Sequence, residues 1–243
     1  MSSKPQRLFV TAKLKPGATL ALGKDQAHYL RNVLRLKQGD NLLLFNGKDG
    51  EWWAELGEVG KNEGQVRLDH QTRPQDVGPD LHYLFAPLKR ARLDYMVQKA
   101  TELGASALRP VITRHTVAER IKSERLHANA VEATEQCGIL RVPEIMEPEK
   151  LAKLLDRWDE GRRLIFADEQ APHVSPLEAL KTLAPGPLAL LIGPEGGFER
   201  EERGALLAMP FVLPIWLGPR VMRADTAAVA ALALVNAALG DWR

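Results

Sequence analysis

From Leu81 to Leu239, short apolar runs alternate with longer segments in which apolar residues recur every three or four positions. The apolar runs are expected to form strands over Leu81–Ala86, Leu108–Ile112, Leu164–Ala167, Leu188–Ile192 and Phe211–Trp216. The periodic segments are expected to form helices over Leu93–Leu103, Leu126–Cys137, Pro176–Leu183, Glu199–Ala208 and Thr226–Leu239. This alternation favours an α/β fold in which helices cover both faces of a mostly parallel sheet. Ligands of such sheets bind in loops at the carboxyl ends of the strands.

The first third of the chain has a pattern typical of β structure. Two apolar runs in "DNLLLFNGKDGEWWAELGEV" flank the turn Asn46–Gly50 and predict a hairpin, and Gly64–His70 predicts another strand. One helix is expected over Lys24–Leu36. The polar segment Arg73–Asp80 contains two prolines and a glycine. It predicts a boundary between a small β-barrel over residues 1–74 and an α/β domain over residues 78–243.

Charge and composition restrict the possible partners. The net charge is +2, but residues 1–75 carry +4, which favours RNA contact by the first domain or simply a solvated basic face. One cysteine excludes an internal disulfide and a multi-cysteine zinc site, and the scattered histidines predict no metal. The longest apolar segment, Thr226–Leu239, is too short to span a membrane. We therefore expect a cytoplasmic protein without membrane or metal partners.

The strand-to-helix loop in "LALLIGPEGGFEREE" (188–202) occupies a place where ligands bind. It matches neither phosphate-binding fingerprint, because no lysine follows the glycines and the G-x-G-x-x-G spacing is missing. Glu195, Glu199, Glu201 and Glu202 crowd the helix start and would repel a phosphate. A neutral or cationic ligand suits the loop better. The alternative is a tight turn followed by a favourably charged helix start.

A second Gly-Pro loop lies in "PIWLGPRVMRADTAAVAALALV" (214–235), before a helix expected to start at Asp225 or Thr226. The two loops are expected to form the walls of one pocket at neighbouring strand ends. Arg220 and Arg223 could clamp a phosphate, polarise a carbonyl oxygen or form salt bridges to glutamates. In a third segment, 131–145, Cys137 has no histidine near it in sequence and is interpreted as a small buried thiol.

Five motifs, in family order, resemble the ribosomal RNA small-subunit methyltransferase E family, the uridine-N3 methyltransferases of the SPOUT superfamily. They are "HYLRNVLRLKQGD", "QKATELG", "EQCG…RVPEI", "LLIGPEGG" and "LGPRVMRADTAA", and the resemblance spans nearly the whole chain. It implies a C-terminal SPOUT-type α/β domain with a trefoil knot and an N-terminal PUA-like β-barrel that binds RNA. It also implies a homodimer that uses S-adenosylmethionine to methylate N3 of a uridine in the decoding region of 16S ribosomal RNA, in the small ribosomal subunit.

The resemblance also implies roles for individual residues. The cofactor would contact Ile192, Gly193, Pro194, Glu195, Gly196, Gly197, Leu217, Gly218, Val221, Met222 and Thr226. Its positively charged sulfonium agrees with the acidic, lysine-free loop. The sequence departs from the family at Glu199, where Ser or Thr is usual, at Arg90 in place of glycine, and at Ile139 in place of arginine.

Methylation at uracil N3 requires loss of the N3 proton, which spreads negative charge onto O2 and O4. Arg223 is expected to stabilise this anion, with Arg220 as the second choice. Arg31 and Arg35 are four residues apart and are expected to share a helix face that docks RNA. The other expected RNA contacts are Arg7, Lys89, Arg92 and Arg141. Two alternatives remain open: methylation at another RNA position, such as a ribose 2′-hydroxyl, or a non-catalytic RNA-binding or ribosome-assembly protein.

Overall fold

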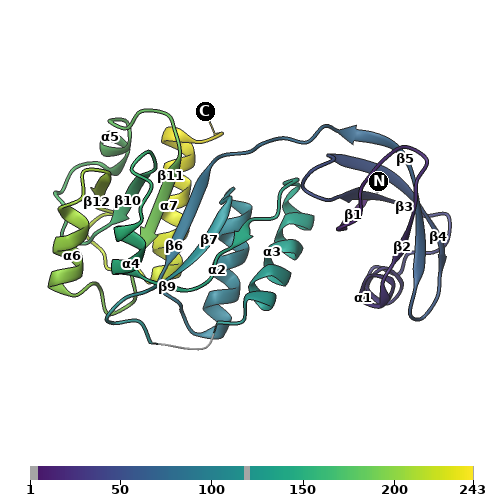
Figure 1. The fold of residues 1–243 in the computed structure, drawn as a ribbon, viewed down its shortest axis with the longest axis horizontal. Coiled ribbons are helices and arrows are strands. Elements are labelled where there is room, and N and C mark those ends of the chain that lie inside the picture. Colours follow the sequence, from purple (N-terminus) through teal and green to yellow (C-terminus); the bar gives the residue numbers. More distant parts are fainter. Residues whose placement is uncertain (1–4, 118–120, 243) are drawn as a thin grey trace. The chain divides into compact units, whose positions relative to one another are not determined.

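The computed structural model describes residues 5–117 and 121–242, which form two compact units (Figure 1). The first unit extends to Val77 and also includes Thr134–Val142. The second unit consists of Gly78–Ala133 and the chain from Pro143 onward. The polar segment Arg73–Asp80 predicts the boundary near Val77, whereas nothing in the sequence pattern indicates that Thr134–Val142 returns to the first unit.

A parallel sheet forms the centre of the second unit. Its strand order is β12-β10-β11-β6-β7-β8, with β9 also paired to β7. The strands are β6 (Leu81–Phe85), β7 (Ala107–Ile112), β8 (Glu144–Ile145), β9 (Glu149–Lys150), β10 (Arg163–Ala167), β11 (Leu188–Ile192) and β12 (Val212–Ile215). All residues of β11 are buried, as expected for a strand covered on both faces.

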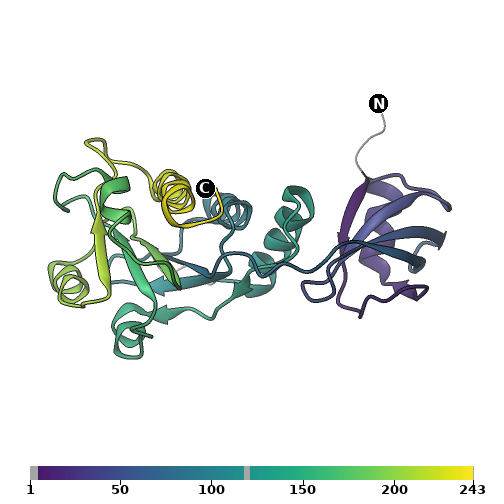
Figure 2. The same cartoon turned by 90° about the horizontal axis from the view of Figure 1, so that it is seen from above.

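Helices cover the two faces of this sheet. They are α2 (Arg90–Glu102), α4 (Leu151–Asp156), α5 (Pro176–Leu180), α6 (Arg200–Leu207) and α7 (Ala224–Leu239). A further helix, α3 (Ser123–Cys137), begins in the second unit, and its residues from Thr134 onward belong to the first unit. On one face, Leu84, Phe166 and Leu191 pack with Leu155 of α4 and Leu206 of α6. Figure 2 shows α2 beside α7, and α7 also contacts β11. The predicted α/β alternation is confirmed, but α4 was missed because six residues give too little helical periodicity.

The first unit contains an apolar core beneath a five-stranded sheet in the order β1-β3-β4-β5-β2. Its strands are β1 (Gln6–Phe9), β2 (Thr19–Leu22), β3 (Asn41–Phe45), β4 (Glu51–Val59) and β5 (Gly64–Arg73). The antiparallel pairing of β3 with β4 confirms the predicted hairpin, and β5 pairs with β4. The sequence did not reveal β1 and β2, because each has only four residues and no clear alternation.

The helix expected over Lys24–Leu36 is shorter and wider than predicted. The α-helix α1 (Lys24–His28) continues as the π-helix η1 (Tyr29–Val33), whose end is marked by a bond from the Leu34 N–H to the Tyr29 carbonyl. Arg35 then adopts φ +57°, in the left-handed region. The prediction that Arg31 and Arg35 share a helix face is therefore wrong, because the helix has ended before Arg35.

Candidate functional site

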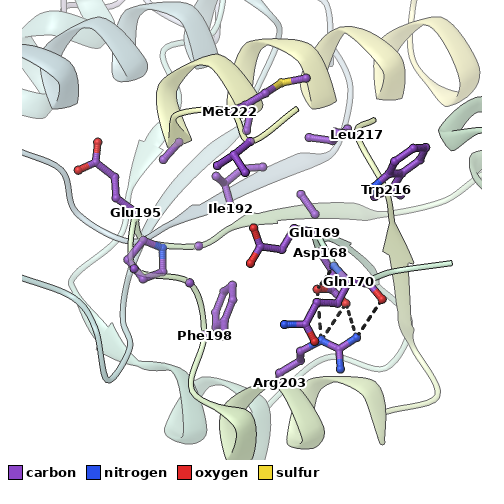
Figure 3. Close-up of a pocket in the computed structure, with 18 of the residues that line it drawn as sticks. Asp168, Glu169, Gln170, Ile192, Glu195, Phe198, Arg203, Trp216, Leu217 and Met222 are labelled. Carbon is purple, nitrogen blue, oxygen red and sulfur yellow. Dashed lines mark hydrogen bonds and ion pairs between the residues drawn. The ribbon is translucent and has the colours of Figure 1, made fainter. Parts of the chain in front are cut away.

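A pocket of about 430 Å³ lies at the carboxyl ends of β10, β11 and β12 (Figure 3). The two Gly-Pro loops both line it, as expected, but their strands are not neighbours, because β10 lies between β11 and β12. The loop after β10 therefore supplies a third wall, formed by Ala167, Asp168, Glu169 and Gln170. The prediction of neighbouring strand ends was wrong because sequence order does not specify strand order.

The loop after β10 brings an acidic group that the sequence analysis missed. Asp168 is buried and receives hydrogen bonds from Arg203, at 2.8 Å from Nη2 and 3.0 Å from Nε to Oδ2. The hydrogen bond with Asp168 raises the pKa of Arg203. Glu169 is exposed, and no ion pair to it occurs within the described ranges. The predicted strand Leu164–Ala167 could have indicated these two residues, because polar residues directly after a parallel strand lie where ligands bind.

Close packing explains two features of the loop after β11. A Cβ at Gly193 would lie 2.3 Å from the Phe198 ring, so no larger residue fits there without movement. Phe198 itself packs edge-on against Phe166, with ring centroids 5.0 Å apart. Gly197 has φ +70°, which favours glycine. The backbone of this loop is thus held close to the pocket by the core beneath it.

The four glutamates of this region do not act as one acidic cluster. Glu195 lines the pocket but forms an ion pair with Arg92 of α2. Glu199 is the N-cap residue of α6, and its carboxylate lies 3.2 Å from His115 Nε2. The Glu202 carboxylate accepts hydrogen bonds from the backbone N–H groups of Glu199 and Arg114. Of the four, only Glu195 lines the pocket. The predicted repulsion of a phosphate ligand therefore involves fewer glutamates than expected.

The loop after β12 contributes Leu217, Gly218, Arg220, Val221 and Met222 to the pocket. Trp216 also lines it and stacks on His173, with ring centroids 4.2 Å apart.

Arg223 and Thr226 are exposed and are not pocket-lining residues. The helix α7 begins at Ala224 with Arg223 as N-cap, so Ala224 and Ala227 line the pocket in place of the predicted Thr226. The structure thus brings together every predicted cofactor residue except Thr226, and places Arg220 but not Arg223 on the pocket wall.

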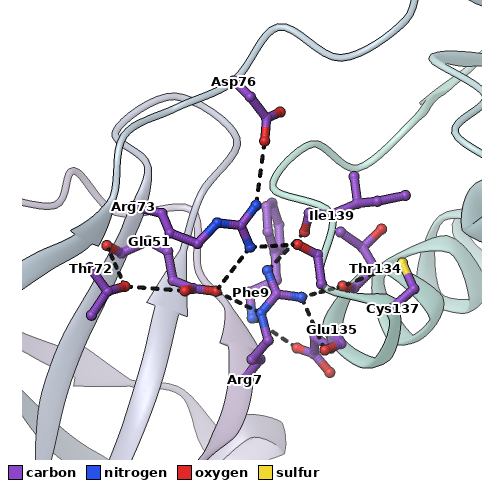
Figure 4. Close-up of polar contacts among 11 residues, drawn as sticks. Arg7, Phe9, Glu51, Thr72, Arg73, Asp76, Thr134, Glu135, Cys137 and Ile139 are labelled. Carbon is purple, nitrogen blue, oxygen red and sulfur yellow. Dashed lines mark hydrogen bonds and ion pairs between the residues drawn. The ribbon is translucent and has the colours of Figure 1, made fainter. Parts of the chain in front are cut away.

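Arg7 does not have the surface position that RNA docking requires (Figure 4). Its side chain is 10% exposed and forms an ion pair with Glu51, 2.8 Å from Nε to Oε2. Its other nitrogens donate to the backbone carbonyls of Thr134, Glu135 and Ile139, all within the first unit. These contacts favour a structural role for Arg7 over the predicted RNA contact, because all three of its side-chain nitrogens are engaged inside the unit.

The other residues expected to contact RNA differ in their surroundings. Arg31, Arg35 and Lys89 are exposed and have no ion pair in the part of the chain that the structure describes. Arg92 is paired with Glu195, and Arg141 is partly buried. Cys137 is exposed, so its interpretation as a buried thiol is wrong: it ends α3 just before Gly138, whose φ of +88° terminates the helix.

Among residues 5–117 and 121–242, no group of three or more His, Cys, Asp or Glu side chains could hold a metal ion. Over the same ranges, no helix combines the length and the apolar character needed to cross a membrane.

Comparison with known proteins assigns both parts of the chain. The family model for an RNA methyltransferase domain matches residues 76–236, and that for an RNA methyltransferase PUA domain matches residues 22–69. A ribosomal RNA small subunit methyltransferase E from Rickettsia conorii is 34% identical over 236 residues, covering 96% of each chain. The protein of that name from Bacillus subtilis is 28% identical over 95% of this chain and 96% of its own.

Two solved structures resemble the whole chain. A methyltransferase from Legionella pneumophila, in complex with S-adenosylmethionine, has a TM-score of 0.88 and 31% identity, covering 98% of this chain and 100% of its own. A ribosomal RNA small subunit methyltransferase E from Neisseria gonorrhoeae, also bound to S-adenosylmethionine, has a TM-score of 0.84 and 25% identity with the same coverage. The two matched domains and these relatives show that the chain belongs to the ribosomal RNA small subunit methyltransferase E family.

Proposed function

We propose that this protein transfers the methyl group of S-adenosylmethionine to N3 of a uridine in the decoding region of 16S ribosomal RNA. Membership of the family and the cofactor in the Legionella and Neisseria structures support the S-adenosylmethionine-dependent reaction on ribosomal RNA. The single observation in this chain that carries the proposal is the pocket shared by the loops after β10, β11 and β12. Its volume of about 430 Å³ is typical of small-molecule sites.

The charges of the pocket suit a ligand that carries both signs. Among its charged lining residues, Asp168 is paired with Arg203 and Glu195 with Arg92. Glu169 and Arg220 remain without ion pairs within the described residues. Figure 3 shows Glu169 pointing toward the middle of the pocket. The sulfonium and amino group of S-adenosylmethionine are cationic and its carboxylate is anionic, so Glu169 and Arg220 offer a complementary charge for each.

Backbone groups would provide the remaining contacts with the cofactor. Gly193, Gly196 and Gly197 line the pocket without side chains of their own, so a ligand can approach their main chain closely. Ile192, Leu217 and Met222 add apolar side chains to the lining. The electrophilic methyl group is what S-adenosylmethionine supplies when it is bound. The residues that line the pocket would orient this methyl group, because they hold the loops after β11 and β12 in place and exclude water from one side.

The uracil must lose its N3 proton before it can accept a methyl group. An exposed arginine at the pocket rim would stabilise the negative charge that develops on O2 and O4. Arg223, the N-cap residue of α7, and Arg220, on the pocket wall, are the candidates in this chain. Neither has an ion-pair partner in the described residues, so either is free to meet the substrate. Water accepts the proton in this scheme.

Four further properties complete the proposal. Arg31, Arg35, Lys89 and Arg141 would contact the RNA, while Arg92 has its first role in pairing with Glu195. The protein would act as a homodimer in the cytoplasm, and its C-terminal domain would contain a trefoil knot. The homodimer and the knot are implied by the family resemblance, and the pocket does not depend on any of these properties.

The decisive experiment is methyl transfer to small ribosomal subunits that lack the modification, followed by nuclease digestion and mass spectrometry of the nucleosides. We expect 3-methyluridine at one position. A ribose-methylated nucleoside would replace the proposal by the 2′-hydroxyl alternative. Absence of both transfer and S-adenosylmethionine binding by calorimetry would instead favour a non-catalytic RNA-binding protein.

A further inference from the structure

Arg203 of α6 contacts the loop after β10 at two places (Figure 3). Its Nε and Nη2 donate to Oδ2 of Asp168 at 3.0 and 2.8 Å, and Nε also lies 3.2 Å from Oδ1. The same Nη2 lies 3.3 Å from the carbonyl oxygen of Gln170. One guanidinium therefore holds acceptors on both sides of Glu169 in the chain.

The turn that contains Glu169 is closed by Asp168. Oδ1 of Asp168 accepts a hydrogen bond from the Gln170 N–H at 3.1 Å, and the Asp168 carbonyl accepts one from the Ala171 N–H at 3.1 Å. The Asp168 N–H donates to the Ile215 carbonyl of β12 at 3.0 Å. The backbone on either side of Glu169 is thus fixed, whereas the Glu169 side chain forms no ion pair within residues 5–117 and 121–242.

The Arg203–Asp168 pair supplies geometry, and Glu169 supplies charge. The Asp168 side chain is 5% exposed and that of Arg203 is 27% exposed, so the fork is largely shielded from water and its opposite charges offset each other. Glu169 is exposed and points toward the middle of the pocket (Figure 3). Attraction between a carboxylate and a cation weakens as their distance grows. Recognition of a cation by Glu169 therefore depends on where the turn 168–171 is held.

We propose that Arg203 is a positioning residue that holds the Glu169 carboxylate toward the cationic sulfonium of S-adenosylmethionine. It fixes the turn 168–171 from α6, the helix that follows the loop after β11, so that two walls of the pocket keep one spacing. Loss of Arg203 lets the turn move and weakens the preference for this ligand over S-adenosylhomocysteine, which lacks the sulfonium charge. This inference rests on the proposed function, because it takes the pocket to be the S-adenosylmethionine site.

A double-mutant cycle tests whether Arg203 acts through Glu169. Arg203→Gln alone would leave the Asp168 carboxylate buried without its cation, which is strongly destabilising. Arg203→Gln is therefore combined with Asp168→Asn, a change that removes both charges and keeps an oxygen that can accept from the Gln170 N–H. Arg203→Lys is the second variant, because it keeps the charge beside Asp168 but cannot form the planar fork.

Calorimetry measures the dissociation constants of S-adenosylhomocysteine and S-adenosylmethionine, and their ratio reports recognition of the sulfonium charge. We expect this ratio to fall about tenfold in Glu169→Gln, roughly fivefold in the paired Arg203 and Asp168 variant, and roughly twofold in Arg203→Lys. Adding Glu169→Gln to the paired variant should lower the ratio no further than Glu169→Gln does alone, because both changes act on the same carboxylate.

Arg162 provides a matched control at the opposite end of the sheet. Its guanidinium forms the same kind of fork with Asp80, at 2.8 and 3.0 Å, and also donates to the Leu188 carbonyl at 2.9 Å. Arg162→Gln combined with Asp80→Asn should leave the ratio of the two dissociation constants as in the wild type, whatever its effect on the Tm.

Three results would overturn the positioning role. They are a wild-type ratio in both Arg203 variants, a wild-type ratio in Glu169→Gln, and a combined variant whose ratio falls by the product of the two separate losses. A wild type that binds neither ligand would overturn the proposed function instead.

Hydrogen exchange separates positioning from general stability. The amides of Gln170 and Ala171 should exchange faster in the paired variant than in the wild type, whereas those of β10 and β11 should be unchanged. Faster exchange throughout the second unit would show a folding defect and would count against a local positioning role.

Discussion

Glu169 is a pocket-lining carboxylate without an ion pair among the described residues, so its charge should matter for binding a cation. Glu169→Gln is expected to weaken S-adenosylmethionine binding by on the order of tenfold, as for loss of a charge-assisted hydrogen bond. S-adenosylhomocysteine lacks the sulfonium charge, so the same substitution should weaken its binding less. Calorimetry with both ligands checks this. Glu160→Gln, an exposed carboxylate outside the pocket, is the control, and equal losses for both ligands would argue against charge recognition.

Arg220 and Arg223 should have separable roles. Arg223→Ala is expected to lower kcat about 100-fold with little change in cofactor affinity, because anion stabilisation is needed only in the transition state. Arg220→Ala should weaken cofactor binding, since Arg220 lines the pocket. Steady-state kinetics on unmethylated subunits and calorimetry distinguish the two. If Arg223→Ala kept the wild-type kcat while Arg220→Ala had no activity, Arg220 rather than Arg223 would be the residue that stabilises the anion.

At the level of residues, the sequence predicts the pocket well where loops follow recognisable strands. The glycine loop and the second Gly-Pro loop both line it, as expected. The sequence shows the basic charge of Arg7 but not its buried contacts, because its carbonyl acceptors lie more than 120 residues away along the chain. Asp168 and Glu169 were not predicted, because they follow the strand expected to end at Ala167 and belong to no recognisable motif.

The junction between β11 and α6 depends on one glycine. Gly193→Ala would place a methyl group 2.3 Å from Cε2 of Phe198 and force the ring or the loop to move. We expect a loss of about 1–3 kcal/mol in the free energy of unfolding, as for overpacked sites, with weaker cofactor binding. Urea unfolding measures it. Gly186→Ala, where a Cβ meets nothing within 4 Å, is the matched control and should cost far less.

An ion pair joins α2 to α3. Arg125 donates to Asp94, which also accepts from Asn129, and the hydrogen bond with Arg125 lowers the pKa of Asp94 below its ordinary value of 3.8. This pairing stabilises the fold above that value and is lost as pH falls through the lowered pKa. Arg125→Met should therefore lower the Tm at neutral pH, with a difference that shrinks below about pH 4.

Thermal unfolding at a series of pH values tests this expectation. Lys153→Met, which removes an exposed cation that has no ion pair among the described residues, should lower the Tm little at any pH. A Tm difference for Arg125→Met that stays constant to the most acid pH would exclude Asp94 as its source.

At the level of elements, periodicity predicts the long helices and the buried strands, because these repeat their pattern several times. It fails for β1, β2 and α4, which are too short to show one. Periodicity also does not distinguish η1 from an α-helix, because a π-helix begins with the same apolar spacing as an α-helix and differs only in its hydrogen bonds.

In the molecule as a whole, the contacts of Arg7 lie within the first unit, so we expect this residue to stabilise that unit rather than to contact RNA. Arg7→Met would leave Glu51 buried without its closest cation and is expected to cost about 3–5 kcal/mol, as for a broken buried pair. Chemical denaturation measures this loss. The salt dependence of RNA binding should stay as in the wild type, whereas Arg31→Ala should reduce its slope by about 1. If Arg7→Met were as stable as the wild type and the salt dependence of its RNA binding were reduced, Arg7 would be assigned to the RNA interface instead.

The segment Thr134–Val142 that completes the first unit is made long after the rest of that unit. On the ribosome, the chain up to Val77 emerges first, and about 65 further residues must follow before Arg7 meets its carbonyl acceptors. At roughly 5–20 residues per second, that delay lasts about 3–13 s. During this time Arg7 lacks its carbonyl acceptors from Thr134–Val142, so the N-terminal unit reaches its final form only after Gly78–Ala133 of its neighbour has been synthesised.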